Sequence, residues 1–270
     1  MTLGLDLSES RDKLRRACEH LHALDAVAEI SSEQFGPYKG RLGDADPKTG
    51  WSPIYVTCPE IPKPVQAKIA ALVGEAVYNM RCALDYIVSA LAKASGAANE
   101  RTQFPVFVDP REYEKGVWRK GEAVGRGSLA GTRHGLSEIE LLQPYHAKPN
   151  PHASPIWAIN RFSNYDKHRS RSVTVPIPGP GDVVIKYGGA TPTNIRLRPP
   201  DRIEVGKEVC IGEARFRTMP TACDIEPKLA VDFLISVGAT GKEPGYATQT
   251  RNFHFARRFV YKVVQRFERL

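Results

Sequence analysis

The chain has 270 residues, of which 41% are hydrophobic and 25% are charged, a composition typical of globular rather than disordered proteins. No stretch approaches the ~18 consecutive apolar residues of a membrane span, and the start, MTLGLDLSESRDKLRR, has acidic residues where a secretory leader is basic. Five widely spaced cysteines without a Cys-x-x-Cys pair favour reduced thiols. We therefore expect a cytoplasmic protein that is not anchored in a membrane.

The formal net charge of +8 is unevenly distributed. Residues 1–135 contain 18 Lys and Arg against 17 Asp and Glu, whereas residues 136–270 contain 20 against 13. A basic half favours a polyanionic partner such as RNA, DNA or a nucleotide phosphate. The alternative is a basic surface that serves only solubility.

Apolar residues recur at helical spacing over residues 8–35 and again over residues 64–94, which predicts two long helices. The buried stripes should comprise Leu14, Ala17, Leu21, Leu24, Val27 and Ala28 in the first helix and Ile69, Val73, Ala76, Met80, Leu84, Ile87 and Leu91 in the second. The Gly- and Pro-rich passage between them ends the first helix, and WSPIYVTCPEIP predicts a short extended segment.

Residues 96–136 predict a long loop with a helical turn near 110–119 and one apolar anchor, FPVF at 104–107. Ser137 and Glu140 have the spacing of a capping box for a short helix, SEIELLQ, that stops at Pro144. A further helix should begin near Ser154 and continue to about His168.

From residue 171 the pattern changes from helical to alternating, which predicts strands separated by Gly, Pro and Asp turns. The segments are RSVTVPIP, DVVIKYG, TNIRLRP, RIEVGKEVCIG, EARFRTMP and LAVDFLISVG, giving five or six strands. A final helix from about Gln249 to Leu270 should bury Ala256, Phe259, Val263 and Phe267 and expose Arg251, Arg258, Lys262, Arg266 and Arg269.

This order of elements predicts an α+β fold. We expect a helical bundle of about four long helices, with an antiparallel β-sheet inserted before the C-terminal helix. The helical region should comprise residues 1–170 together with the closing helix 249–270, and the β region residues 171–248.

The strongest candidate site is NRFSNYDKHRSR, residues 160–171. In a helix, Trp157, Arg161, Asn164 and His168 would project along one stripe. Arg161 can clamp a phosphate, and His168, with an ordinary pKa near ~6.5, can exchange a proton at cellular pH. Supporting residues would be Asn164, Asp166 and Lys167, with Lys167, Arg169 and Arg171 on flanking phosphates.

This constellation predicts an RNA-cleaving or RNA-binding protein that needs neither a metal nor another cofactor. Asp166 and His168 lie two residues apart on a helix and would not converge on one ion, so we expect no metal site. The alternative is a non-catalytic binding or scaffold protein, in which cations simply favour the C-terminal end of a helix.

A second candidate lies in the long helix at YNMRCALDY, residues 78–86. Arg81 and Asp85 are four residues apart and can form an ion pair, while Asn79 and Tyr86 share a face. Opposite His168, this polar strip would complete one pocket that binds the substrate. The alternative is a surface ion pair with a half-buried tyrosine.

The closing helix offers a third surface. Its cations, with Phe255 and Tyr261 available for base stacking, would suit a polyanion. Otherwise this stripe is a solvated helix face, which is the commoner role of such stripes.

The ordered motifs YNMRCALDY, FPVF, LLQPY and NYDKHR, within residues 63–170, resemble those of a group of bacterial and phage proteins without an established activity. That group has NLRSALDH-like, FPIF-like, LQPY and NxDKHR motifs. More loosely, the chain resembles the HEPN superfamily of helical-bundle ribonucleases, whose signature is Arg, four to six residues, then His. Arg161 and His168 match this signature, whereas Tyr86 replaces the histidine that would follow Arg81. The HEPN resemblance implies RNA cleavage, a role in a defence or mobile-element system and a homodimer.

Overall fold

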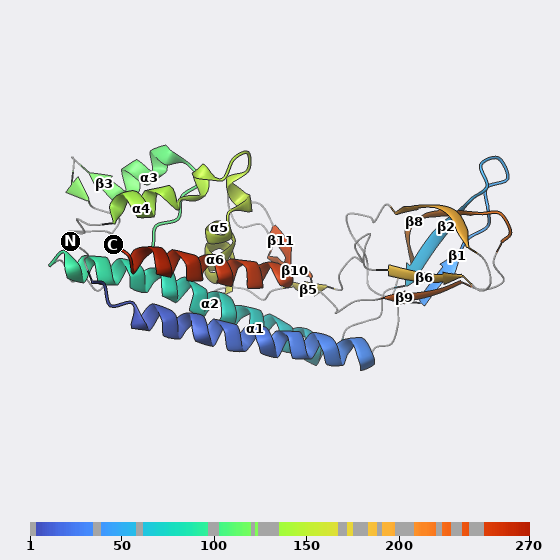
Figure 1. The fold of residues 1–270 in the computed structure, drawn as a ribbon, viewed down its shortest axis with the longest axis horizontal. Coiled ribbons are helices and arrows are strands. Elements are labelled where there is room, and N and C mark those ends of the chain that lie inside the picture. Colours follow the sequence, from blue (N-terminus) through green and yellow to red (C-terminus); the bar gives the residue numbers. More distant parts are fainter. Residues whose placement is uncertain are drawn as a thin grey trace. The chain divides into compact units, whose positions relative to one another are not determined.

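The structure is a computed structural model in which the chain adopts an α+β fold, as predicted (Figure 1). It describes residues 4–34, 39–57, 62–96, 103–119, 122–123, 135–166, 172–174, 183–187, 191–197, 208–219, 223–227, 234–237 and 246–270. The chain divides into two compact units. A helical unit comprises Met1–Leu24, Ala71–Arg171 and Arg251–Leu270, and a β unit comprises Asp25–Ala70 and Ser172–Thr250.

The described part of the chain contains six α-helices. They are α1 (Ser8–Gln34), α2 (Lys63–Ala94), α3 (Pro110–Val117), α4 (Leu136–Leu141), α5 (Pro155–Asp166) and α6 (Arg251–Phe267), with 3₁₀ turns η1 (Pro144–His146) and η2 (Pro151–Ala153). No helix in this described part combines the length and the apolar composition that crossing a bilayer requires.

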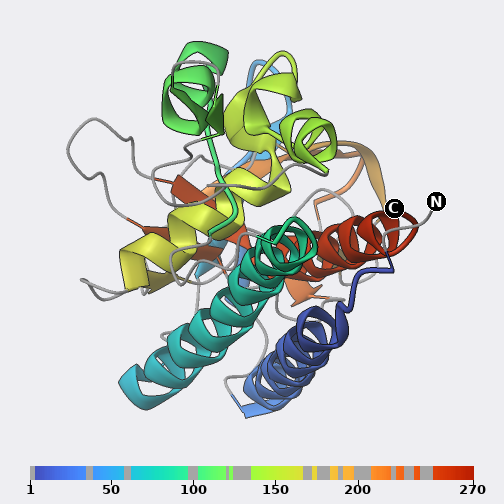
Figure 2. The same ribbon diagram turned by 90° about the vertical axis from the view of Figure 1, so that its left-hand side faces the viewer.

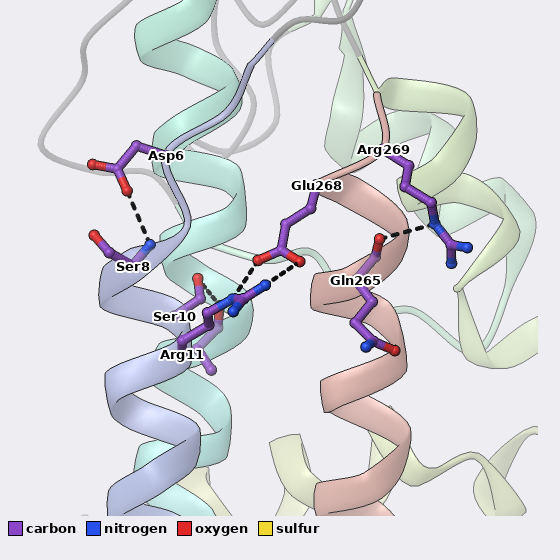
Figure 3. Close-up of polar contacts among 8 residues, drawn as sticks. Asp6, Ser8, Ser10, Arg11, Gln265, Glu268 and Arg269 are labelled. Carbon is purple, nitrogen blue, oxygen red and sulfur yellow. Dashed lines mark hydrogen bonds and ion pairs between the residues drawn. The ribbon is translucent and has the colours of Figure 1, made fainter.

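The apolar stripes of the two long helices are buried as predicted. Each of the thirteen expected positions in α1 and α2 has at most 8% of its surface exposed. Within the helical unit, α6 lies beside α1 and α2 (Figures 1 and 2). Polar contacts join these helices at one end: the Ser10 hydroxyl donates to the carbonyl of Ala83 at 3.0 Å, and Arg11 forms a two-bond ion pair with Glu268 (Figure 3).

The β unit contains a four-stranded antiparallel sheet. Its order is β1 (Lys39–Leu42), β2 (Trp51–Thr57), β8 (Glu208–Phe216) and β7 (Pro192–Leu197). Two smaller sheets accompany it: β6 (Val183–Tyr187) pairs with β9 (Cys223–Pro227), and β10 (Leu234–Val237) lies between β11 (Tyr246–Gln249) and β5 (Ser172–Thr174). In the helical unit, β3 (Trp118–Arg119) and β4 (Glu122–Ala123) form a short hairpin.

The β unit differs from the sequence prediction in three respects. It includes Asp25–Ala70, which we had placed in the helical region, because β1 and β2 pair in the sheet that contains β8. The two strands expected around Gly212 form one strand, β8, which keeps its pairing with β2 through a β-bulge. The residues before α6 form an unexpected strand, β11, so α6 begins at Arg251 rather than near Gln249.

The predicted capping box of α4 is not formed. The N-cap is Gly135, which has φ of 70° and makes no side-chain cap, and Ser137 lies within the first turn. A Cβ at position 135 would meet Leu91 at 2.9 Å and Phe267 at 3.2 Å. A glycine is therefore required both by the left-handed backbone and by the close approach of two core side chains.

Candidate nucleic-acid interface

The predicted stripe on α5 is only partly exposed. Trp157 is 6% exposed and Arg161 is 4% exposed, whereas Asn164 is exposed to solvent. Apolar neighbours at Ile159 and Phe162 are buried as well, so the middle of α5 is surrounded by other elements. We had expected Arg161 and Asn164 to share an open face of the helix, but only Asn164 is exposed.

The remaining residues of that candidate site, Lys167, His168, Arg169 and Arg171, lie outside the described residues. The structure describes α5 as far as Asp166, and its expected end near His168 lies outside the described residues. Catalysis by Arg161 and His168 therefore stays a prediction.

The second candidate pair binds the protein's own backbone. Arg81 and Asp85 form an ion pair at 3.1 Å, and their side chains are 13% and 28% exposed. Arg81 Nη2 donates to the carbonyl of Phe104 at 2.6 Å, and the amide of Phe104 donates to Asp85 Oδ1 at 2.7 Å. The pair therefore fixes both backbone polar groups of Phe104, whose side chain is 1% exposed. This is a structural clamp rather than the simple surface ion pair that we had considered.

A second clamp holds the same segment through Gln143. The Gln143 side chain donates to the carbonyls of Pro105 and Ile139, both at 3.0 Å, and accepts from the amide of Phe107 at 3.1 Å. Gln143 is 2% exposed, so the two bonds that its side chain donates are shielded from water. The three motifs YNMRCALDY, FPVF and LLQPY thus meet along one extended segment, which ties α2 to α4 and η1.

The other two predicted binding residues on α2 lie apart from this clamp. Asn79 is 4% exposed, and its amide donates to the carbonyl of Glu75 at 2.8 Å within the same helix. Tyr86 lines a cavity of about 380 Å³ between the start of α1 and the end of α2. Its charged lining residues are Asp6, Glu9 and Lys93. Because two carboxylates and one ammonium group line this cavity, its charge does not suit a polyanionic ligand.

A cluster that the sequence analysis did not single out surrounds Glu140. Its Oε1 accepts from the Tyr145 hydroxyl and contacts His146 Nε2, both at 2.7 Å. The Tyr145 bond and then His146 lower the pKa of Glu140, while burial and the nearby Glu140 charge raise the pKa of Tyr113 to about 12. These contacts fasten η1 to α4. We had interpreted Glu140 as part of a helix cap and therefore did not place it with Tyr145 and His146, which follow five and six residues later.

The described residues contain no group of three or more His, Cys, Asp and Glu side chains that could hold a metal ion.

The exposed face of α6 is a predicted basic surface that the structure describes. We call it the α6 basic face; it comprises Arg251, Phe255, Arg258, Tyr261, Lys262, Arg266 and Arg269, all of which are exposed. Spacings of three and four residues align its members within α6, other than Tyr261, on one stripe, and Arg269 follows two residues after the helix ends; α6 itself contains no Asp or Glu. The opposite side is the predicted apolar one, except that Phe259 is only partly buried.

Two aromatic rings are interleaved with these cations. Phe255 is 60% exposed and Tyr261 is 42% exposed. Exposed rings that lie between cations are the arrangement with which proteins can stack on bases while they bind the phosphates. Stacking of this kind is how proteins hold nucleobases without reading a sequence.

Two of the cations near the end of α6 bind groups of the protein itself. Arg266 pairs with Glu138, and Arg269 Nε donates to the carbonyl of Gln265 at 3.1 Å. In the part of the chain that the structure describes, neither Arg258 nor Lys262 forms an ion pair. These two cations flank Tyr261, and their charge is available to an external anion.

Comparison of the chain with protein-family models, with curated proteins and with solved structures found no match. The resemblances to the phage-protein group and to the HEPN superfamily therefore stay predictions.

Proposed function

We propose that this protein binds RNA through the α6 basic face. The observation that carries the proposal is the combination of uncompensated cations, Arg258 and Lys262, with the exposed rings of Phe255 and Tyr261 on one helix. Cations neutralise phosphates and release their counterions, and aromatic rings stack on bases. At 1.5 Å per residue, the stripe from Arg251 to Arg266 extends over about 22 Å, enough for several nucleotides.

The buried position of Arg161 favours binding over cleavage as the function of the described residues. A guanidinium that is 4% exposed cannot clamp a phosphate of a polymer that stays in solvent. We further propose a cytoplasmic location, which the free thiols of Cys18, Cys82 and Cys210 support.

The test is a charge-removal experiment. A fluorescent 12-nucleotide RNA is titrated with the unaltered protein and with Arg258→Gln/Lys262→Gln, and binding is followed by anisotropy at several salt concentrations. Loss of two phosphate contacts with a single strand should lower the salt slope by about 1.4 and weaken binding roughly 10- to 30-fold at 0.1 M salt.

The matched control is Arg111→Gln/Lys115→Gln, which removes two exposed cations from α3. If net charge alone mattered, both double variants would weaken binding equally, and the proposal would be wrong. Absence of RNA binding by the unaltered protein at 50 mM salt would also overturn it.

A further inference from the structure

The outer face of the four-stranded sheet gathers aromatic rings and arginines. Along β2, Ser52, Ile54 and Val56 are buried, at 0%, 0% and 1% exposed, so the side chains between them point outward. Trp51 and Tyr55 are among these outward residues, and both are partly exposed. The buried row anchors the strand in a core, and the outer row is left for another purpose.

Each ring has an arginine stacked on it. The guanidinium carbon of Arg196, on β7, lies 4.3 Å from the centre of the Trp51 ring. That of Arg41, on β1, lies 4.4 Å from the centre of the Tyr55 ring. Arg215, on the adjacent strand β8, is the register partner of Trp51 and is exposed, so Trp51 has arginines from β8 and from β7, the strand beyond it.

The charges on this face differ in how they are compensated. Arg41 is held by Glu208 through two bonds of 2.6 and 2.5 Å, and this contact lowers the pKa of the Glu208 carboxyl. Within the described residues, Arg196 and Arg215 form no ion pair. Glu213, on β8, is the register partner of Arg196 and forms no ion pair within the described residues, so two arginines and one carboxylate leave a net positive charge on the strands beside Trp51.

The chain beside Trp51 is held in place by local bonds. The amide of Asp46 donates to the Trp51 carbonyl at 2.9 Å, and the Asp46 carboxylate accepts from the Thr49 hydroxyl at 2.8 Å. Gly50, with φ of 69°, turns the chain into β2, and a Cβ there would lie 3.4 Å from Arg215 Nε. Trp51 thus stands on a fixed backbone, so little order has to be gained when a ligand stacks on it.

We propose that this face is a stacking platform for single-stranded RNA. A base would stack against the Trp51 and Arg196 pair, and Arg196 and Arg215 would contact the phosphates on either side. Bases of a duplex are stacked on each other and present no free face to such a ring, so the platform selects single strands. The choice of RNA as the ligand rests on the proposed function. The residues of the platform belong to the β unit, whereas the α6 basic face belongs to the helical unit.

The test compares binding of a 12-nucleotide RNA, alone and annealed to its complement, by the full chain. Trp51→Leu removes the ring, Trp51→Phe keeps a ring, and Thr57→Ala is the control at another outward position of β2. Trp51→Leu should weaken single-strand binding by roughly five- to a hundred-fold, as expected for one lost base stack. Trp51→Phe should recover most of this loss, and Thr57→Ala should bind like the unaltered protein.

Thermal unfolding of each variant shows whether the β unit stays folded. Equal affinity of Trp51→Leu and the unaltered protein, or equal binding of duplex and single strand, would overturn the platform. The two proposals fail separately: loss of binding in Arg258→Gln/Lys262→Gln but not in Trp51→Leu leaves only the α6 basic face, and the reverse result leaves only the platform.

Discussion

Replacement of Asp85 by alanine tests the clamp that the YNMRCALDY motif forms with the FPVF segment. The substitution removes the acceptor of the Phe104 amide and the ion-pair partner of Arg81. A hydrogen bond from a backbone amide to a carboxylate contributes about 1.5–3 kcal/mol. The ion pair adds only about 0.5–1 kcal/mol, because Asp85 keeps 28% of its side chain exposed and solvent screens the charge. We expect Asp85→Ala to lower the free energy of unfolding by about 2–4 kcal/mol.

Urea unfolding followed by far-UV circular dichroism measures this change. The matched control is Glu19→Ala, which breaks the Arg15–Glu19 pair on α1; both of its side chains are 59% exposed, so the expected loss is below about 0.5 kcal/mol. The clamp would be refuted if both variants shifted the midpoint equally. RNA affinity of Asp85→Ala, measured below its unfolding temperature, should equal that of the unaltered protein, because these side chains contact the protein itself.

Two further substitutions test other parts of the helical unit. Gly135→Ala should lower stability by about 1–3 kcal/mol, since it adds a Cβ at a left-handed position that Leu91 and Phe267 approach closely; a melting temperature unchanged within 1 °C, on the order of measurement error, would contradict this. Glu140→Gln tests the lowered pKa of Glu140. Because that pKa is lowered in the folded protein, ionised Glu140 stabilises the fold at pH values above its ordinary pKa. This contribution is lost as the pH falls through the lowered pKa. The melting temperatures of Glu140→Gln and the unaltered protein should therefore differ at pH 7 and converge in acid, whereas a constant difference would exclude the carboxylate charge as the cause.

Helical periodicity predicted the long helices well because burial on one side leaves a regular apolar stripe. The stripes of α1 and α2 were confirmed at every position, and the cations of α6 are exposed as expected. The apolar pattern needs no knowledge of tertiary partners, since any partner has to cover the same stripe.

The errors concern features that long-range contacts decide. Burial of Arg161 follows from how completely other elements surround α5, and a polar residue in a helix gives no indication of this. The predicted pair of Arg81 and Asp85 is formed, but the bond from the Phe104 amide to Asp85 could not be predicted, because Phe104 lies nineteen residues away. Short strands such as β11 are fixed by their neighbour β10 rather than by their own sequence.

The structural clamps also bear on the ordered motifs. Arg81, Asp85 and Gln143 all bind the segment 104–107, so three of the four motifs are joined by hydrogen bonds to one stretch of backbone. An ordered set of motifs can thus reflect one packed substructure rather than an active site.

Photochemical crosslinking tests most directly whether the α6 basic face contacts RNA. The unaltered protein is irradiated with a bound 4-thiouridine-containing RNA, digested, and analysed by mass spectrometry. If the α6 basic face contacts RNA, crosslinks are expected at Phe255 or Tyr261. Crosslinks confined to peptides that exclude residues 251–267, at a saturating RNA concentration, would contradict it.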